Sequence, residues 1–197
     1  MRPIPSGHAI HLCLDMQLMF GRNGPWPTPW MERVLPKVLH LAETMPARTI
    51  FTRFIPPLHA DDMPGTWREF YRKWRNITRQ ELPAEQLELL PELRRFVPPA
   101  AVFDKLVYSA FADGRLAHHL AERGASTLLV SGAETDVCVL ATVLAAVDHG
   151  YRVVIVTDAI CSSSDEGHDA LMRMYTGRFD IQIELATAEE VIEALAG

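Results

Sequence analysis

Short runs of Val, Ile, Leu and Phe recur along the chain. Most of them lack the alternation of apolar and polar residues that is typical of a strand with one solvent-exposed face. Segments with the helical spacing of apolar residues separate most of these runs. Buried strands that alternate with helices predict an α/β fold with a parallel sheet covered on both faces. The expected strands are residues 8–15, 47–54, 100–108, 126–132, 152–159 and 181–185, and the expected helices are 30–45, 113–124, 135–150, 165–177 and 187–197.

Right-handed crossovers restrict such a chain to a doubly wound, six-stranded sheet of the Rossmann type, with three layers. The segment at about 56–99 interrupts the pattern, because it is irregular apart from a short helical piece in "AEQLELLPEL". With 197 residues, the chain is expected to form a single domain, 1–197, in which 56–99 is a lid-like insertion.

Composition narrows the class of protein. The formal net charge is -6 and no basic stripe is present, which argues against a nucleic-acid partner. No apolar run approaches the ~20 residues of a membrane span, and the first residues do not resemble a signal peptide. Cys13, Cys138 and Cys161 are an odd number of widely spaced cysteines, which suggests free thiols in a reducing cytoplasm.

Reactive side chains stand at or just beyond the carboxyl ends of three predicted strands. Asp15 ends the first strand, Lys105 lies at the end of the third, and Cys138 follows the fourth. In a doubly wound sheet, ligands bind beyond the carboxyl ends of the strands, where the strand order reverses. The three side chains are therefore expected to converge if the first and fourth strands flank that point.

These residue types fit acyl transfer through a thioester. Cys138 falls in the first turn of a predicted helix, where the helix N-terminus and a nearby Lys105 would lower the pKa of the thiol. Asp15 can take the thiol proton and return it to a leaving amine, and backbone N–H groups of the helix can bind the oxyanion. The alternative is an ion pair of Asp15 and Lys105 beside a buried cysteine. For Cys13 and Cys161, burial as small apolar residues is the favoured interpretation.

Five segments of the chain carry a resemblance to a known family: "LDMQ" (14–17), "FTR" (51–53), "DKLVYSAF" (104–111), "VSGAETDVCVLATVLAAVDHGYRVVIVTDA" (130–159) and "SSSDEGHDALMRM" (162–174). With them the chain resembles the isochorismatase-like cysteine hydrolases, which include nicotinamidase, N-carbamoylsarcosine amidohydrolase and isochorismatase. The resemblance implies the six-stranded fold, a catalytic set of Asp15, Lys105 and Cys138, and a cis peptide between Ala133 and Glu134. It also implies that the N–H groups of Glu134 and Cys138 form the oxyanion hole.

One departure from the family concerns metal. Nicotinamidases place a metal-binding D-x-H directly after the second strand, where this chain has Phe54 and Pro56. We therefore expect no metal and no cofactor, and nicotinamidase activity is disfavoured. His59, Asp61 and Asp62 in "LHADD" are a weak alternative site, because such clusters are more often solvated loops.

The expected activity is hydrolysis of a C–N bond in a small amide, carbamoyl or ureido substrate. Isochorismatase-type cleavage of a vinyl ether is the first alternative, although it needs the aspartate and not a thiol, so that Cys138 favours amide chemistry. A non-catalytic binding protein on the same fold is the second. The resemblance also implies a homodimer or homotetramer, and the sequence does not name the substrate.

Several side chains are candidates to bind that substrate. Trp26, Trp67 and Phe111 are expected to form pocket walls, and Arg53, directly after the second strand, to hold a carboxylate or carbonyl. Packing in the core or at a subunit interface is the alternative for the rings, and a structural ion pair is the alternative for Arg53. Gln17 is expected to support Asp15 without contacting the substrate.

Overall fold

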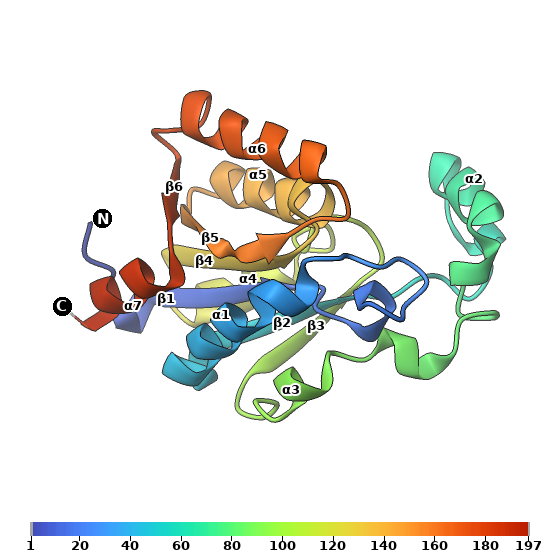
Figure 1. The fold of residues 1–197 in the computed structure, drawn as a ribbon, viewed down its shortest axis with the longest axis horizontal. Helices are drawn as coiled ribbons and strands as arrows, with labels where there is room; N and C mark the ends of the chain where they lie inside the picture. The colour runs from blue at the N-terminus through green and yellow to red at the C-terminus, as the bar shows by residue number, and fades with distance from the viewer. Residues whose placement is uncertain (1, 197) are drawn as a thin grey trace.

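A computed structural model describes residues 2–196 of the chain, so that Gly197, the last residue of the expected final helix, lies outside it. Six strands form one parallel sheet in the order β3-β2-β1-β4-β5-β6 (Figure 1). This confirms the predicted doubly wound α/β fold. The strands are β1 (Ala9–Leu14), β2 (Thr49–Phe54), β3 (Ala101–Lys105), β4 (Thr127–Ala133), β5 (Arg152–Cys161) and β6 (Ile183–Ala186).

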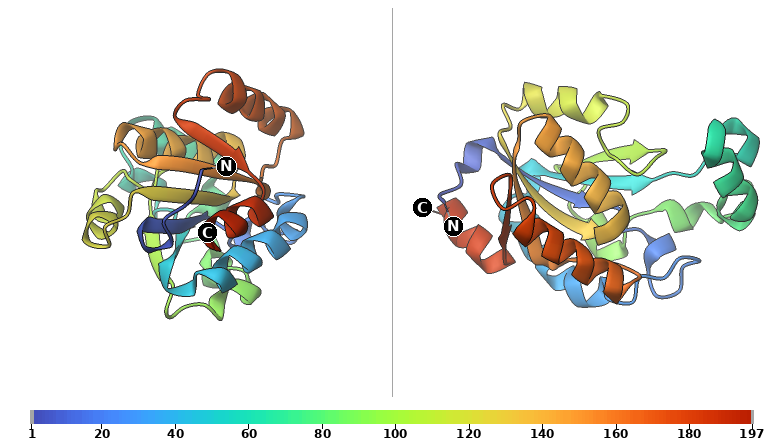
Figure 2. Two further views of the ribbon diagram at one scale, coloured as in Figure 1. Left: turned by 90° about the vertical axis from the view of Figure 1, so that its left-hand side faces the viewer. Right: turned by 90° about the horizontal axis from the view of Figure 1, so that it is seen from above.

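Helices cover both faces of the sheet, as Figures 1 and 2 show. One apolar core lies under α1 and α7, and a second lies under α4, α5 and α6. The central strands β1 and β4 are buried on both faces, so that they carry mostly apolar residues at consecutive positions and lack an alternation of apolar and polar residues. The helices are α1 (Met31–Thr44), α2 (Gly65–Lys73), α3 (Pro91–Arg94), α4 (Arg115–Glu122), α5 (Leu140–Asp148), α6 (Asp165–Gly177) and α7 (Ala188–Ala196).

The strand order reverses between β1 and β4, because the chain builds outward from β1 first to one edge and then to the other. At the carboxyl end of this pair, Leu14 lies in register with Gly132. Gly132 has a φ of +100°, and a Cβ built there would lie 2.1 Å from the carbonyl oxygen of Leu14. Glycine at this position therefore lets the two strands approach closely just before the polar residues that follow them.

The insertion at 56–99 carries more structure than the sequence indicated. Its segment GTWREFYRK (65–73), rich in aromatic and basic residues, forms α2. This helix stands away from the sheet on the side opposite both chain termini (Figures 1 and 2). The helical piece expected near residue 90 is divided into a 3-10 turn, Ala84–Leu87, and the short α3. Pro91 opens α3, in agreement with the preference of proline for the first turn of a helix.

Candidate active site

Asp15 directly follows β1 in a left-handed backbone conformation, with a φ of +50°. Aspartate is among the few non-glycine residues that tolerate this region. Its carboxylate is 1% exposed and accepts a hydrogen bond of 2.6 Å from the Thr52 hydroxyl on Oδ1. The neighbouring strand β2 therefore fixes the orientation of the carboxylate.

Lys105 is the last residue of β3, two strands away from β1. Its side chain extends past the end of β2, with Nζ 5.0 Å from the centroid of the Phe54 ring. The ammonium lies 2.7 Å from Asp15 Oδ2 and 3.3 Å from Cys138 Sγ, and it also donates to the Val107 carbonyl at 3.2 Å. One buried cation thus joins the carboxylate to the thiol.

Cys138 lies in a π-helical turn, Thr135–Val139, that connects β4 to α5. The sequence predicted a continuous helix over 135–150, whereas the structure has this wider turn first and α5 after it. Cys138 is 6% exposed, and its sulfur faces a pocket. The structure therefore brings together the three side chains that the sequence placed at strand ends.

The charges in this cluster do not favour a thiolate. Burial raises the pKa of the Cys138 thiol well above its ordinary value, and the Asp15 carboxylate raises it further, while Lys105 opposes both effects only in part. Burial alone would lower the pKa of Lys105, but the negative charges of Asp15 and Cys138 outweigh it, so that this pKa is raised. The expectation of a lowered thiol pKa is thus wrong for this structure, because burial and the Asp15 charge together outweigh Lys105.

Backbone donors border the sulfur. The peptide between Ala133 and Glu134 is cis. The N–H groups of Val137 and Val139, on either side of Cys138, both donate to the Glu134 carbonyl, at 3.1 and 3.0 Å. Within residues 2–196, the Glu134 N–H has no hydrogen-bond acceptor. This amide is consequently available to a bound carbonyl oxygen.

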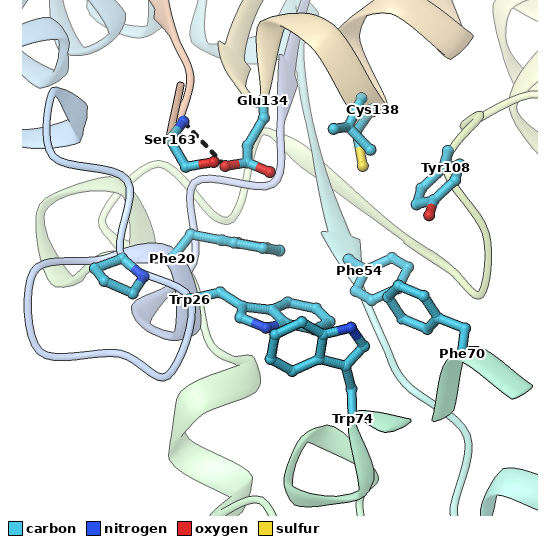
Figure 3. A pocket seen from close by; sticks show the side chains of 11 residues that line it. Phe20, Trp26, Phe54, Phe70, Trp74, Tyr108, Glu134, Cys138 and Ser163 are labelled. Atoms are coloured by element: carbon cyan, nitrogen blue, oxygen red, sulfur yellow. Dashed lines mark hydrogen bonds between the residues drawn. The ribbon is translucent and has the colours of Figure 1, made fainter. Parts of the chain in front are cut away.

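A pocket of about 360 Å³ opens above Cys138. Figure 3 shows the Cys138 sulfur and the Glu134 carboxylate directed into one space, with the Phe20, Trp26 and Trp74 rings on its other side. The pocket is small and mostly aromatic, which suits a compact organic molecule. Its lining consists of Phe20, Trp26, Pro27, Phe54, Phe70, Trp74, Tyr108, Glu134, Val137, Cys138 and Ser163.

Of the predicted substrate-binding residues, Trp26 lines this pocket and Arg53 does not. Successive side chains of a strand point to opposite sides, and Phe54, the next residue of β2, takes the pocket side. The Arg53 guanidinium instead makes a bidentate pair with Asp104 at 2.8 and 2.9 Å and contacts Glu88 at 3.1 Å. The alternative interpretation of Arg53, a structural ion pair, agrees with this placement.

Trp67 and Phe111 also lie outside the lining. Trp67 stands behind Tyr108, with 4.7 Å between their ring centroids, and Phe111 is buried against the ring of His149, with centroids 4.9 Å apart. Both rings therefore pack within the protein and do not contact the pocket.

Gln17 is fully buried below the site. Its amide accepts from the Phe54 N–H at 2.7 Å and donates to the carbonyls of Phe54 and Leu87 at 3.1 and 2.8 Å. These bonds hold the end of β2 in place, so that Gln17 supports the site without reaching it.

Sequence reasoning missed several lining residues, namely Phe20, Phe54, Tyr108 and the side chain of Glu134. Phe54 and Tyr108 could have been found, because each lies within three residues of the end of a strand that carries a predicted site residue. Glu134 was considered only for its backbone amide. Phe20 lies in a short 3-10 turn, Leu18–Phe20, which has no marker in the sequence.

The residues considered for a metal site are placed apart from the pocket. Nδ1 of His59 lies 2.8 Å from the Gln80 side-chain oxygen, and the His59 N–H donates to Asp62. In the part of the chain that the structure describes, no group of three or more His, Cys, Asp and Glu side chains is arranged to hold a metal ion.

Comparisons with known proteins point to one family. The family model of the isochorismatase domain matches residues 9–189. The isochorismatase family protein PncA of Bacillus subtilis (strain 168) is 34% identical over 86 residues, which are 44% of this chain and 47% of that protein. Nicotinamidase 3 of Arabidopsis thaliana is 33% identical over 86 residues, which are 43% of each chain. This chain spans about half the length of the curated relatives it matches.

The fold is found in solved structures as well. A cysteine hydrolase from Pseudomonas syringae pv. phaseolicola 1448A superposes with a TM-score of 0.84 at 23% identity. The superposition covers 100% of this chain and 96% of that one. At this level of identity, the likeness concerns the arrangement of the strands and helices.

Proposed function

Because the chain belongs to the isochorismatase family of hydrolases, we propose that it hydrolyses the C–N bond of a small amide through a thioester on Cys138. The observation that carries the proposal is the continuous contact from Asp15 through Lys105 to the Cys138 sulfur beneath the pocket. The similarity to a relative named nicotinamidase supports an amide as the substrate.

The first half of the reaction forms the thioester. As the Cys138 sulfur attacks the amide carbon, its proton passes to Asp15, and the amide C–N bond then breaks as Asp15 returns that proton to the leaving ammonia or amine. In the second half, a water molecule attacks the thioester and gives its proton to Asp15. The C–S bond breaks, the product acid leaves, and the proton returns to the sulfur.

The raised thiol pKa agrees with this order of events. Moving the proton from sulfur to Asp15 exchanges one buried anion for another beside the same Lys105 cation, so the cluster stays neutral overall. A permanent thiolate would instead place a second anion beside Asp15 in a buried site, which is costly. The proton transfer is therefore coupled to attack on the substrate.

The oxyanion of each tetrahedral intermediate needs donors at the carbonyl position. The Glu134 N–H, which has no acceptor within residues 2–196, and the Cys138 N–H between two bonded amides are the candidates. Lys105 contacts both Asp15 and the sulfur. The base thus follows β1, Lys105 ends β3, and the nucleophile and the oxyanion donors come from the segment after β4.

The test is Cys138→Ala, assayed with a panel of small primary amides for ammonia release. We expect turnover to fall at least ~1000-fold, because no other group in the cluster can form the acyl intermediate. Cys161→Ala is the matched control, since this buried cysteine lies outside the pocket lining, and it should keep turnover. Undiminished amide hydrolysis by folded Cys138→Ala would overturn the thioester route. Cleavage of isochorismate by both variants would point to ether chemistry.

A further inference from the structure

The pocket has a chemical character that amide hydrolysis by itself does not require. Its walls are aromatic rings, and its charged side chain is the carboxylate of Glu134. We propose that the pocket selects a cationic amide, whose ammonium or methylated ammonium group is held between the rings and Glu134. The inference rests on the proposed function for the bond that is cleaved, whereas binding of the cation can be measured separately.

The rings are arranged as partial walls of a cage. Trp26 is at its centre: it stacks on Phe20 at 6.2 Å between centroids, and Trp74 and Phe70 meet it edge to face at 5.7 and 5.9 Å. Figure 3 shows Phe20, Trp26 and Trp74 facing the space below Glu134. Aromatic faces carry negative charge density and attract cations, and several such faces together suit a quaternary ammonium.

Glu134 is held in place with one oxygen still free. Its Oε1 accepts from the Ser163 N–H at 3.1 Å and from the Thr28 hydroxyl at 3.4 Å. Across the described residues, Oε2 has no hydrogen-bond partner. The carboxylate is half-buried and points into the pocket beside the sulfur (Figure 3). A fixed anion in a partly dry, aromatic site favours a cation more strongly than an exposed one would.

The pocket lacks what an anionic substrate would need. Among the described lining residues there is no Lys, Arg or His. Lys105 is already paired with Asp15 below the pocket, and Arg53 is held by Asp104 outside it. A substrate carboxylate would therefore meet Glu134 without a counter-ion, which is unfavourable.

One ring of the cage already contacts a cation of the chain itself. The ammonium of Lys73, an exposed residue outside the lining, lies 5.4 Å from the centroid of the Trp74 ring. Trp74 is 36% exposed, so this contact lies at the rim of the pocket.

The binding test uses two molecules of nearly equal shape, choline and its uncharged isostere 3,3-dimethylbutan-1-ol. Neither contains an amide, so the wild-type protein can be titrated with both, and quenching of tryptophan fluorescence reports occupancy. We expect choline to bind at least about tenfold more tightly, because cation–π contacts and the Glu134 charge act on it alone. Equal affinity for the two molecules would overturn the inference.

Variants assign the preference to residues. Glu134→Gln keeps the shape and the Ser163 contact but removes the charge, and it should abolish most of the preference for choline. Trp74→Leu should weaken choline binding several-fold while binding of the isostere changes little. The control is Glu189→Gln on α7, an exposed carboxylate far from α2 (Figure 1), which should keep the full preference. An unchanged preference in Glu134→Gln would contradict the assigned role of the carboxylate.

A second assay separates failure of this inference from failure of the proposed function. Ammonia release is measured from betaine amide, a cation, from 3,3-dimethylbutanamide, its neutral isostere, and from succinamate, an anion. Preferential cleavage of betaine amide supports both proposals. Tight choline binding with no cleavage of any amide would leave the cation site standing and count against the hydrolase. Cleavage that favours succinamate would support the hydrolase and overturn the cation site.

Discussion

At the scale of single residues, Asp15 has two opposing effects on the thiol. In the proposed mechanism its carboxylate takes the proton, yet its negative charge raises the pKa of Cys138 and so keeps that proton on sulfur. Lys105 contacts both groups, and its positive charge partly offsets the rise in the pKa of Cys138. The removal of the carboxylate charge should therefore separate thiol ionisation from catalysis.

The change Asp15→Asn tests this separation. Asparagine tolerates the left-handed backbone and can keep the Thr52 hydrogen bond, so the fold should persist. Without the carboxylate charge, burial alone opposes Lys105, so the pKa of Cys138 falls towards its ordinary value. The pH midpoint of Cys138 alkylation by iodoacetamide should then drop by about one pH unit or more, while turnover falls at least ~100-fold.

The other cysteines give little background in this experiment. Cys13 and Cys161 are fully buried, and burial raises the pKa of Cys13 to about 12. A midpoint that stays in place or rises in Asp15→Asn would contradict the account of the cluster given above. Wild-type Cys138 itself should react slowly at neutral pH.

At the scale of elements, the approach of β4 to β1 depends on Gly132. Gly132→Ala would place a Cβ against the backbone of Leu14, the residue before Asp15, in addition to a positive φ. We expect it to lower the free energy of unfolding by about 3 kcal/mol or more and to reduce turnover by displacing Asp15.

The matched control for this prediction is Gly150→Ala, two residues after the end of α5. Gly150 also has a positive φ, +83°, but a Cβ there would meet no atom within 4 Å. Gly150→Ala should lower the free energy of unfolding by only about 1 kcal/mol and leave turnover unchanged. Urea unfolding monitored by circular dichroism measures both changes, and equal losses at the two glycines would show that the contact with Leu14 is unimportant.

The sequence predicted the strands better than the walls of the site. Strands buried on both faces are visible as apolar runs, and β1 begins and ends within one residue of its expected range. The third strand was predicted too long, because Leu106 and Tyr108 continue the apolar run. They are 51% and 37% exposed and lie beyond the sheet, where Tyr108 lines the pocket. An apolar residue that lines a pocket cannot be distinguished by sequence from one that packs in the core.

The convergence of Asp15, Lys105 and Cys138 could be predicted because the topology brings the ends of their strands together. The substrate contacts could not, because they depend on which way individual side chains point. Arg53 points away from the pocket, whereas its neighbour Phe54 points into it. Phe111 packs against the ring of His149 instead of lining the pocket. Such orientations are set by neighbours distant in the sequence.

At the scale of the whole molecule, Arg152 of β5 ties the sheet edge to the N-terminal segment. It makes bonds of 2.8 Å to Glu184 on β6 and donates to the carbonyls of Arg2 and Pro3 at 3.0 and 2.9 Å. Glu184 also pairs with the Arg2 side chain. Hydrogen bonding from Arg152 lowers the pKa of Glu184 to about 2.

This shift predicts a pH-dependent contribution to stability. A carboxyl with a lowered folded-state pKa stabilises the fold above its ordinary pKa of 4.5, and the effect is lost as pH falls towards about 2. Glu184→Gln should therefore lower the free energy of unfolding near pH 7 by about 1 kcal/mol, allowing for screening by solvent. The difference from wild type should shrink between pH 4.5 and 2, which urea titrations at several pH values would measure. A difference independent of pH would contradict the ion-pair origin.

In the whole molecule, no helix of residues 2–196 is long and apolar enough to cross a membrane. The buried apolar residues of the sheet and its covering helices form the two cores.

The position of α2 has a consequence for how such a protein can diversify. Cys138, Asp15 and Lys105 are set by the sheet, whereas Phe70 and Trp74 come from an excursion that begins and ends between β2 and β3. A lineage can exchange the segment between β2 and β3 and acquire new ligand preferences while Asp15, Lys105 and Cys138 stay in place.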